Sequence, residues 1–156
     1  MTRESDRAAT PTNAAISAAA GAGAKRRVLL VDDDVDFLDI HRIALEGAGY
    51  EVAIAHDAPE AMLAATSAPF DVAVLDVIMH GPHDGFELAR ALRRDPRTRH
   101  TQLIMLTSIN AVNEARGIFF RFGDQDRDDH FLPVDRFIDK PVAHDALVRL
   151  VSELVV

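Results

Sequence analysis

The sequence predicts one α/β domain built around a parallel β-sheet, and two patterns lead to that fold class. Short, continuously apolar runs alternate with segments of helical period, five times between residues 28 and 154. Apolar runs of this length are typical of strands that are buried on both faces, as in parallel sheets covered by helices. A strand–helix alternation also requires crossover connections, which are right-handed in almost all proteins.

The first half of the chain carries two strands and two helices in this prediction. A helix follows the first strand, because Asp34 or Asp36 can cap its start and Gly47 and Gly49 can end it. The expected ranges are 28–31 and 51–55 for the strands and 58–67 for the second helix. The buried face of the first helix should combine apolar side chains with one histidine, namely Phe37, Leu38, His41, Leu45 and Ala48.

The second half repeats the alternation. A turn that contains Gly81, Pro82 and Gly85 leads into a helix, which Asp95 and Pro96 close. The other expected elements are strands at 71–76, at 103–106 running into Thr107, and at 134–138, helices at 86–94, near 110–122 and at 143–154, and an acid-rich loop at 123–133.

Composition separates a tail from a domain. Residues 1–24 are rich in Ala, Gly, Ser and Thr and show no apolar period, so we expect a flexible tail over 1–25 and one domain over 26–156. Residues 1–27 carry five basic and two acidic side chains; the net charge of −8 for the whole chain therefore leaves −11 for the rest. Such an acidic domain is a poor candidate for non-specific nucleic-acid binding, which needs Lys and Arg.

Other compositional limits narrow the function further. The chain contains no cysteine, which excludes disulfides, thiolate metal sites and cysteine nucleophiles. No apolar run approaches the roughly 20 residues that span a bilayer. We therefore expect a cytoplasmic protein with no membrane insertion.

Polar side chains stand where four of the predicted strands end. Asp32 and Asp33 follow the first strand, Asp76 ends the third, Thr107 ends the fourth, and Lys140 follows the fifth. Ligands of open α/β sheets bind at this carboxyl edge of the strands. The pattern thus predicts that three carboxylates, a hydroxyl and an ammonium group converge on one site.

A cation would resolve the repulsion among these carboxylates. Two unit charges 4 Å apart cost about 4 kcal/mol at an effective dielectric constant of 20. Mg²⁺ fits such a site because it prefers oxygen ligands and is held by one or two carboxylates together with phosphate oxygens. A carboxylate nucleophile can form an aspartyl-phosphate, and the lysine and threonine could then hold phosphoryl oxygens.

The same segments resemble the receiver domains of two-component response regulators. The resemblance rests on VLLVDDD (28–34), FDVAVLDVIM (70–79) with GPHDGFEL (81–88), IMLTS (104–108) and FIDKP (137–141). It implies the flavodoxin-like (βα)5 fold, a doubly wound parallel sheet with strand order 2-1-3-4-5.

The resemblance also implies a role for each site residue. Asp76 would be the phosphoacceptor and a metal ligand, with Asp33 as a direct Mg²⁺ ligand and Asp32 as a water-mediated one. The main-chain carbonyl of Ile78 would complete the metal site. The remaining matches are Thr107 as the switch hydroxyl, Lys140 as the phosphoryl-binding lysine, Phe137 as the switch aromatic, and Pro141 as a cis-proline.

The function implied is that of a signalling switch and not of an enzyme. A sensor histidine kinase would donate the phosphoryl group to Asp76 in a Mg²⁺-dependent, self-catalysed reaction. Because no output domain is expected, the protein would be a stand-alone, single-domain response regulator. It would then change its affinity for a downstream protein partner through Thr107 and Phe137, or relay the group to a histidine phosphotransfer domain.

The sequence departs from the family pattern in two places, and two isoleucines match a variation that the family associates with restricted access of water. His80 replaces the proline that usually follows the methionine. Extra residues near 120–133 form an insertion, in which Phe119, Phe120 and Phe122 could pack on the sheet or form a partner or homodimer surface. Bulky Ile78 and Ile109 flank the acceptor and the switch threonine, and we expect them to slow hydrolysis of the phosphoryl group.

Alternative functions have weaker support in the sequence. An aspartate-nucleophile phosphatase wants a second acid two residues after the nucleophile, where this chain has Ile78. A nucleotide- or flavin-binding module wants a glycine-rich turn after the first strand. A pseudo-receiver scaffold would not need the whole acidic set.

Two other candidate sites have weak support. Residues 124–135 have the alternating acids of a Ca²⁺ loop but lack its sixth-position glycine and twelfth-position glutamate. His41 is expected to be a partly buried helix residue rather than a phosphohistidine.

Overall fold

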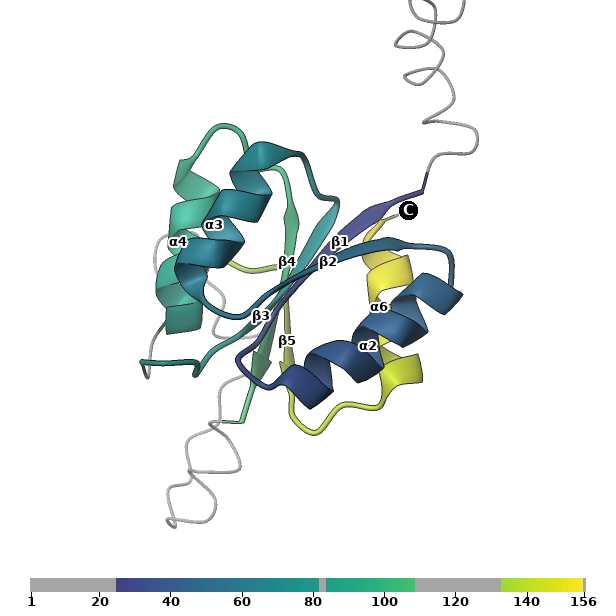
Figure 1. Ribbon diagram of the computed structural model, residues 1–156. Helices are drawn as coiled ribbons and strands as arrows, with labels where there is room; N and C mark the ends of the chain where they lie inside the picture. The colour runs from purple at the N-terminus through teal and green to yellow at the C-terminus, as the bar shows by residue number, and fades with distance from the viewer. Residues whose placement is uncertain (1–24, 82–83, 109–132, 156) are drawn as a thin grey trace, which may run out of the picture.

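The computed structural model describes residues 25–81, 84–108 and 133–155. Its five strands form one parallel sheet in the order β2-β1-β3-β4-β5, which confirms the predicted fold class (Figure 1). The strands are β1 (Arg27–Val31), β2 (Glu51–Ala55), β3 (Val72–Asp76), β4 (Gln102–Thr107) and β5 (Arg136–Asp139).

Helices cover both faces of this sheet (Figure 1). One face carries α2 (Val35–Gly47) and α6 (His144–Leu154), and the other carries α3 (Ala58–Ser67) and α4 (Asp84–Arg94). Alternate side chains of each strand point to opposite faces. In β1, Leu29 and Val31 therefore join the core beneath α3 and α4, whereas Val28 and Leu30 join the core beneath α2 and α6.

The start and end of α2 follow from local chemistry. Of the two aspartates that could cap this helix, Asp34 does so, because its carboxylate accepts a hydrogen bond from the backbone N–H of Phe37 at 3.2 Å. Gly49 adopts a φ of 101°, a left-handed conformation in which glycine carries no steric penalty. Ala48, which was expected on the buried face, is exposed because the helix ends before it.

Two element starts differ from the prediction by two residues, and the other differences are of a single residue. Helix α4 begins at Asp84, before the expected residue 86, and Gly85 is buried in its first turn. Strand β5 begins at Arg136 instead of residue 134. There, Asp135 bonds Leu103 both through its backbone N–H (2.8 Å) and through its carboxylate, which accepts the N–H of Leu103 at 2.7 Å. This side-chain bond replaces the regular strand ladder.

Several predictions concern segments beyond the described ranges. Three predicted segments lie outside the described ranges: the tail except for Lys25, the helix near 110–122, and the insertion near 120–133 except for Pro133. Ile109, Phe119, Phe120 and Phe122 also fall there. Within the described ranges, no helix combines the length and apolar character needed to cross a membrane.

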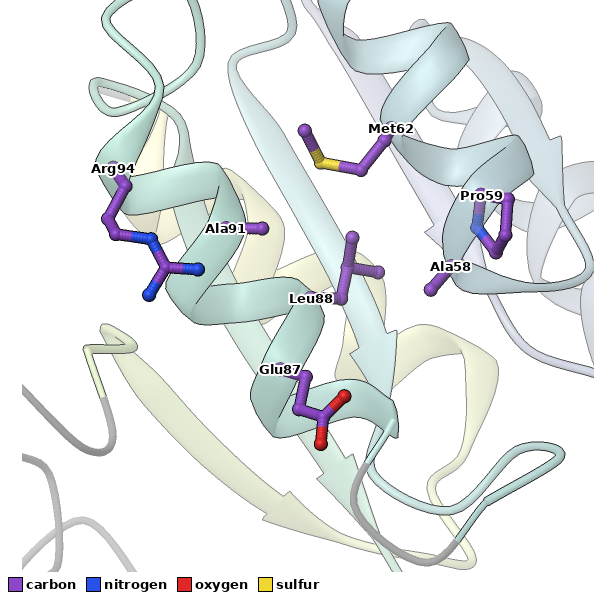
Figure 2. Close-up of a pocket in the computed structure, with 7 residues that line it drawn as sticks. All are labelled: Ala58, Pro59, Met62, Glu87, Leu88, Ala91 and Arg94. Atoms are coloured by element: carbon purple, nitrogen blue, oxygen red, sulfur yellow. The ribbon is translucent and has the colours of Figure 1, made fainter.

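A shallow groove of about 390 Å³ runs between α3 and α4 (Figure 2). Met62 and Leu88 point into the space between the two helices, and Glu87 and Arg94 stand on the α4 side. Its lining consists of Ala58, Pro59, Met62, Glu87, Leu88, Ala91 and Arg94. None of the side chains predicted to form the acidic site lines this groove.

Candidate functional site: an acidic edge of the sheet

The carboxyl edge of the sheet brings the three predicted aspartates together. Asp32 follows β1 directly and its backbone N–H donates to the carbonyl of Ala55 at 3.1 Å, which holds it at the end of the ladder. Asp76 is the last residue of β3, the neighbouring strand. One carboxylate oxygen from each of Asp32, Asp33 and Asp76 lies within 4.8 Å of the others. Asp32 and Asp76 are buried, whereas Asp33 is exposed.

Lys140 supplies the positive charge of this cluster. Its ammonium lies 2.7 Å from Asp32 Oδ2 and 3.5 Å from Asp76 Oδ2. Its backbone N–H donates to the carbonyl of Thr107 at 2.9 Å, so that β4 fixes the position of the lysine main chain. Burial acts to lower the pKa of Lys140, but the hydrogen bond to Asp32 and the charge of Asp76 outweigh this effect and raise it.

The single positive charge of Lys140 does not balance the negative charge of three carboxylates, and the raised pKa of Asp76 reflects both its burial and this imbalance. Burial and, after it, the nearby charge of Asp32 together raise the pKa of Asp76 from 3.8 to about 7, against the opposing effect of Lys140. Asp76 is only 4% exposed, so water screens these charges weakly. The side chains of the site therefore carry an excess of negative charge that a cation would neutralise.

The donor set fits Mg²⁺. In the described part of the chain, Asp76 Oδ1 is the one buried side-chain oxygen or nitrogen without a hydrogen-bond partner. Buried polar atoms normally have partners, and a metal ion is one explanation for an exception. Hard carboxylate oxygens are the ligands that Mg²⁺ prefers, and the exposed Asp33 leaves one side of the cluster accessible to solvent.

The backbone after Asp76 is held from two sides. The N–H of Val77 donates to the carbonyl of Leu106 at 2.9 Å, and the carbonyl of Val77 accepts the N–H of Gly85 at 2.9 Å. A Cβ atom on Gly85 would stand 2.1 Å from the carbonyl oxygen of Asp76 and 2.7 Å from Val77 Cα. Only glycine allows α4 to approach the acceptor this closely.

Sequence reasoning treated Gly85 only as a turn residue. The available signal was a glycine inside a segment of helical period, which often marks a packing requirement. The structure shows that this glycine belongs to the wall of the site. Ile78, whose main-chain carbonyl is the expected metal contact, follows Val77 in the same segment and is half-buried.

The remaining predicted site residues lie around the same edge. Thr107 ends β4 and is 1% exposed. Phe137 is half-buried, pairs in register with Met105 and packs against the core beneath α3 and α4. The peptide bond between Lys140 and Pro141 is cis.

The alternative sites are not assembled by the described residues. His41 is a buried helix residue, 5% exposed, and the described surface histidines His80, His100 and His144 are exposed. Asp135, the twelfth position of the possible Ca²⁺ loop, instead forms an ion pair with Arg93 at 2.6 Å. The other positions of that loop, up to residue 132, lie outside the described ranges.

Comparison with known proteins agrees with the geometry. A model of the response regulator receiver domain family matches residues 28–126. Response regulator PleD of Caulobacter vibrioides is 37% identical over 84 residues, which cover 54% of this chain and 18% of that protein. The transcriptional regulator RpaA of Synechocystis is 35% identical over 88 residues, which cover 56% and 36%. The chain thus matches about a third or less of the length of these curated relatives.

Solved structures match over a larger share of the chain. The chemotaxis response regulator CheY4 of Vibrio cholerae superposes with a TM-score of 0.65 at 27% identity, covering 84% of this chain and 99% of CheY4. A CheY-like receiver domain protein of Methanospirillum hungatei gives a TM-score of 0.65 at 26% identity, covering 85% and 94%. The chain therefore belongs to the response regulator receiver domain family, whose members are phosphorylation-controlled signalling switches of two-component systems.

Proposed function

We propose that Asp76 is the phosphoacceptor of this domain and that a sensor histidine kinase donates the phosphoryl group in a Mg²⁺-dependent reaction. The observation that carries this proposal is the buried carboxylate of Asp76 with one oxygen unpartnered, beside two further aspartates and a lysine. A buried acid in this setting is poorly stabilised as an anion, and a cation bound beside it would favour the ionised, nucleophilic form.

The contacts of the chain's own residues support a direct transfer of the phosphoryl group. An ionised Asp76 oxygen attacks the phosphorus; a P–O bond forms as the P–N bond to the donor histidine breaks, and that nitrogen keeps the electron pair. Asp32, Asp33, Asp76 and the carbonyl of Ile78 would hold Mg²⁺, which when bound neutralises charge on the transferred group. Lys140 would bind a phosphoryl oxygen, and its distance of 3.5 Å from Asp76 Oδ2 supports this role.

The signal would leave the site through the ends of β4 and β5. We propose that the Thr107 hydroxyl turns toward the phosphoryl group and that Phe137, on the adjacent strand, changes its packing in response. A downstream protein that contacts the ends of these two strands would sense the change. The output is then binding of a downstream protein, or relay of the group to a histidine phosphotransfer domain.

The proposal is tested by incubating the protein with acetyl phosphate and Mg²⁺ and measuring intact mass. We expect wild type to gain one acid-stable, base-labile phosphoryl group, and to gain none when the metal is chelated. Asp76→Asn should gain none, whereas Asp39→Asn, which alters an exposed aspartate of α2, should react as wild type does. Failure of wild type to react, or equal labelling of Asp76→Asn, would overturn the assignment.

A further inference from the structure

The ammonium of Lys140 also rests on an aromatic ring that the proposed mechanism does not use. Its Nζ lies 4.5 Å from the centroid of the Phe37 ring. A cation within about 6 Å of a ring centroid is attracted by the ring's negative face. The ring therefore adds a contact to those with Asp32 at 2.7 Å and Asp76 at 3.5 Å, and the three together restrict where the ammonium can stand.

His41 in turn supports the Phe37 ring. The two rings stack with centroids 3.9 Å apart and planes 25° from parallel. The residues are four apart on α2, which places their side chains on the same face of the helix. His41 is buried at 5% exposure, so its ring is confined by its surroundings. The phenyl ring consequently lies between the imidazole and the lysine.

The same imidazole connects α2 to the segment that carries Lys140. Its Nδ1 lies 2.9 Å from the carbonyl of Phe37, and its Nε2 lies 3.3 Å from the carbonyl of Val142. Because carbonyl oxygens only accept, whichever ring nitrogen carries a proton donates to the carbonyl that it faces. Val142 follows Lys140 by two residues, so His41 is held between the ring beneath the lysine and the backbone after it.

We propose that Phe37 and His41 are positioning residues that hold the Lys140 ammonium over the acidic site. This inference rests on the proposed function of Asp76, because its consequence is a lysine already placed for a phosphoryl oxygen. A lysine side chain is a flexible four-carbon stem with a strongly hydrated charge. Without the ring it has one contact fewer to oppose its movement into water, and the transferred group meets a less ordered cation.

The test compares two phenylalanines that each lie beneath a cation. Phe37→Leu removes the ring under Lys140 but keeps an apolar side chain. Phe70→Leu is the matched control, because the Arg27 guanidinium lies 4.3 Å from the Phe70 ring. We expect Phe37→Leu to slow phosphorylation by acetyl phosphate about two- to fivefold, with no loss of Mg²⁺ affinity by calorimetry. Phe70→Leu should react at the wild-type rate, and Phe37→Tyr, which keeps the ring, should restore it.

A second measurement does not depend on phosphorylation. In wild type, the ring current of Phe37 should shift the NMR signals of the Lys140 ε-methylene group, and this shift should vanish in Phe37→Leu but persist in Phe70→Leu. His41→Leu should weaken both the shift and the rate, and its effect should not add to that of Phe37→Leu, because the two side chains act as one unit.

Each outcome separates the two proposals. If wild type gains no phosphoryl group but keeps the ring-current shift, the proposed function of Asp76 is wrong and the contact between Lys140 and Phe37 is confirmed. Lys140 signals that do not change in Phe37→Leu, or an equal loss of rate in Phe70→Leu, would overturn the positioning role.

Discussion

The burial of Asp76 makes the stability of the metal-free protein depend on pH. The pKa of this carboxyl is raised from 3.8 to about 7 by burial and by the charge of Asp32, so the folded chain binds the proton more tightly than the unfolded chain does. As the pH rises through that window, the folded state must create a buried charge and its free energy of unfolding falls.

Asp76→Asn should remove this dependence. In chelator, we expect the variant to be more stable than wild type at about pH 8, by roughly 1–3 kcal/mol, and closer to it at about pH 4. Urea unfolding at several pH values measures the difference. Asp39→Asn, at the exposed surface of α2, should track wild type. Parallel stability curves for wild type and Asp76→Asn would show that the acceptor is not the titrating group.

The acidic residues of the site could be predicted from the sequence, whereas the side-chain contacts that hold Lys140 beside them could not. Asp32, Asp33 and Asp76 each follow an apolar strand, and all parallel strands present their carboxyl ends at one edge. Phe37 and Lys140 are far apart in the sequence and come near each other because the parallel sheet brings the segments after β1 and β5 to one edge. Their contact depends on side-chain positions that no local pattern carries.

The first turn of α4 is shaped by the strand that precedes it. A glycine inside a helix is normally replaced by alanine with a gain in stability of about 1 kcal/mol. At Gly85 the sign should reverse, because the added Cβ would stand 2.1 Å from the carbonyl oxygen of Asp76. We expect Gly85→Ala to lower the free energy of unfolding by about 1–3 kcal/mol through overpacking, as measured by urea denaturation, and to slow phosphorylation.

Gly47 at the end of α2 provides the control for this substitution. A Cβ on Gly47 would meet nothing within 4 Å, so Gly47→Ala should leave stability unchanged or raise it by up to about 1 kcal/mol. Equal behaviour of the two alanine variants would mean that α4 can move away from the acceptor without cost.

Element boundaries were predictable where a local signal ends the element. Helix α3 spans the predicted residues because Asp57 caps it and Ala58–Ser67 is a compact run of helix formers. The sequence predicts a β5 that starts two residues early, because Val134 and Asp135 continue its apolar–polar pattern. The carboxylate of Asp135 instead accepts hydrogen bonds from the Arg93 guanidinium and the Leu103 backbone N–H. These partners are distant in the sequence, so the local pattern does not predict them.

At the level of the whole molecule, the site joins strands that belong to one cooperative sheet. Its carboxylates come from β1 and β3, neighbours at the centre, and its lysine follows the edge strand β5. The two cores lie on opposite faces of the same strands. An unfolded chain does not bring these oxygens together, so an ion that needs all of them binds the folded state alone and stabilises the entire domain.

Mg²⁺ should therefore raise the melting temperature of wild type in a concentration-dependent way. At a free concentration about 100 times the dissociation constant, the gain in unfolding free energy is about 2.7 kcal/mol. Asp33→Asn should weaken the response, because it removes one of the three clustered carboxylates. Asp34→Asn is the matched control. Asp34 is the neighbouring aspartate, it does not belong to the cluster, and asparagine can replace it as the cap of α2. Thermal unfolding across a Mg²⁺ titration decides the matter: a full response in Asp33→Asn, or an equal loss in Asp34→Asn, would place the ion elsewhere.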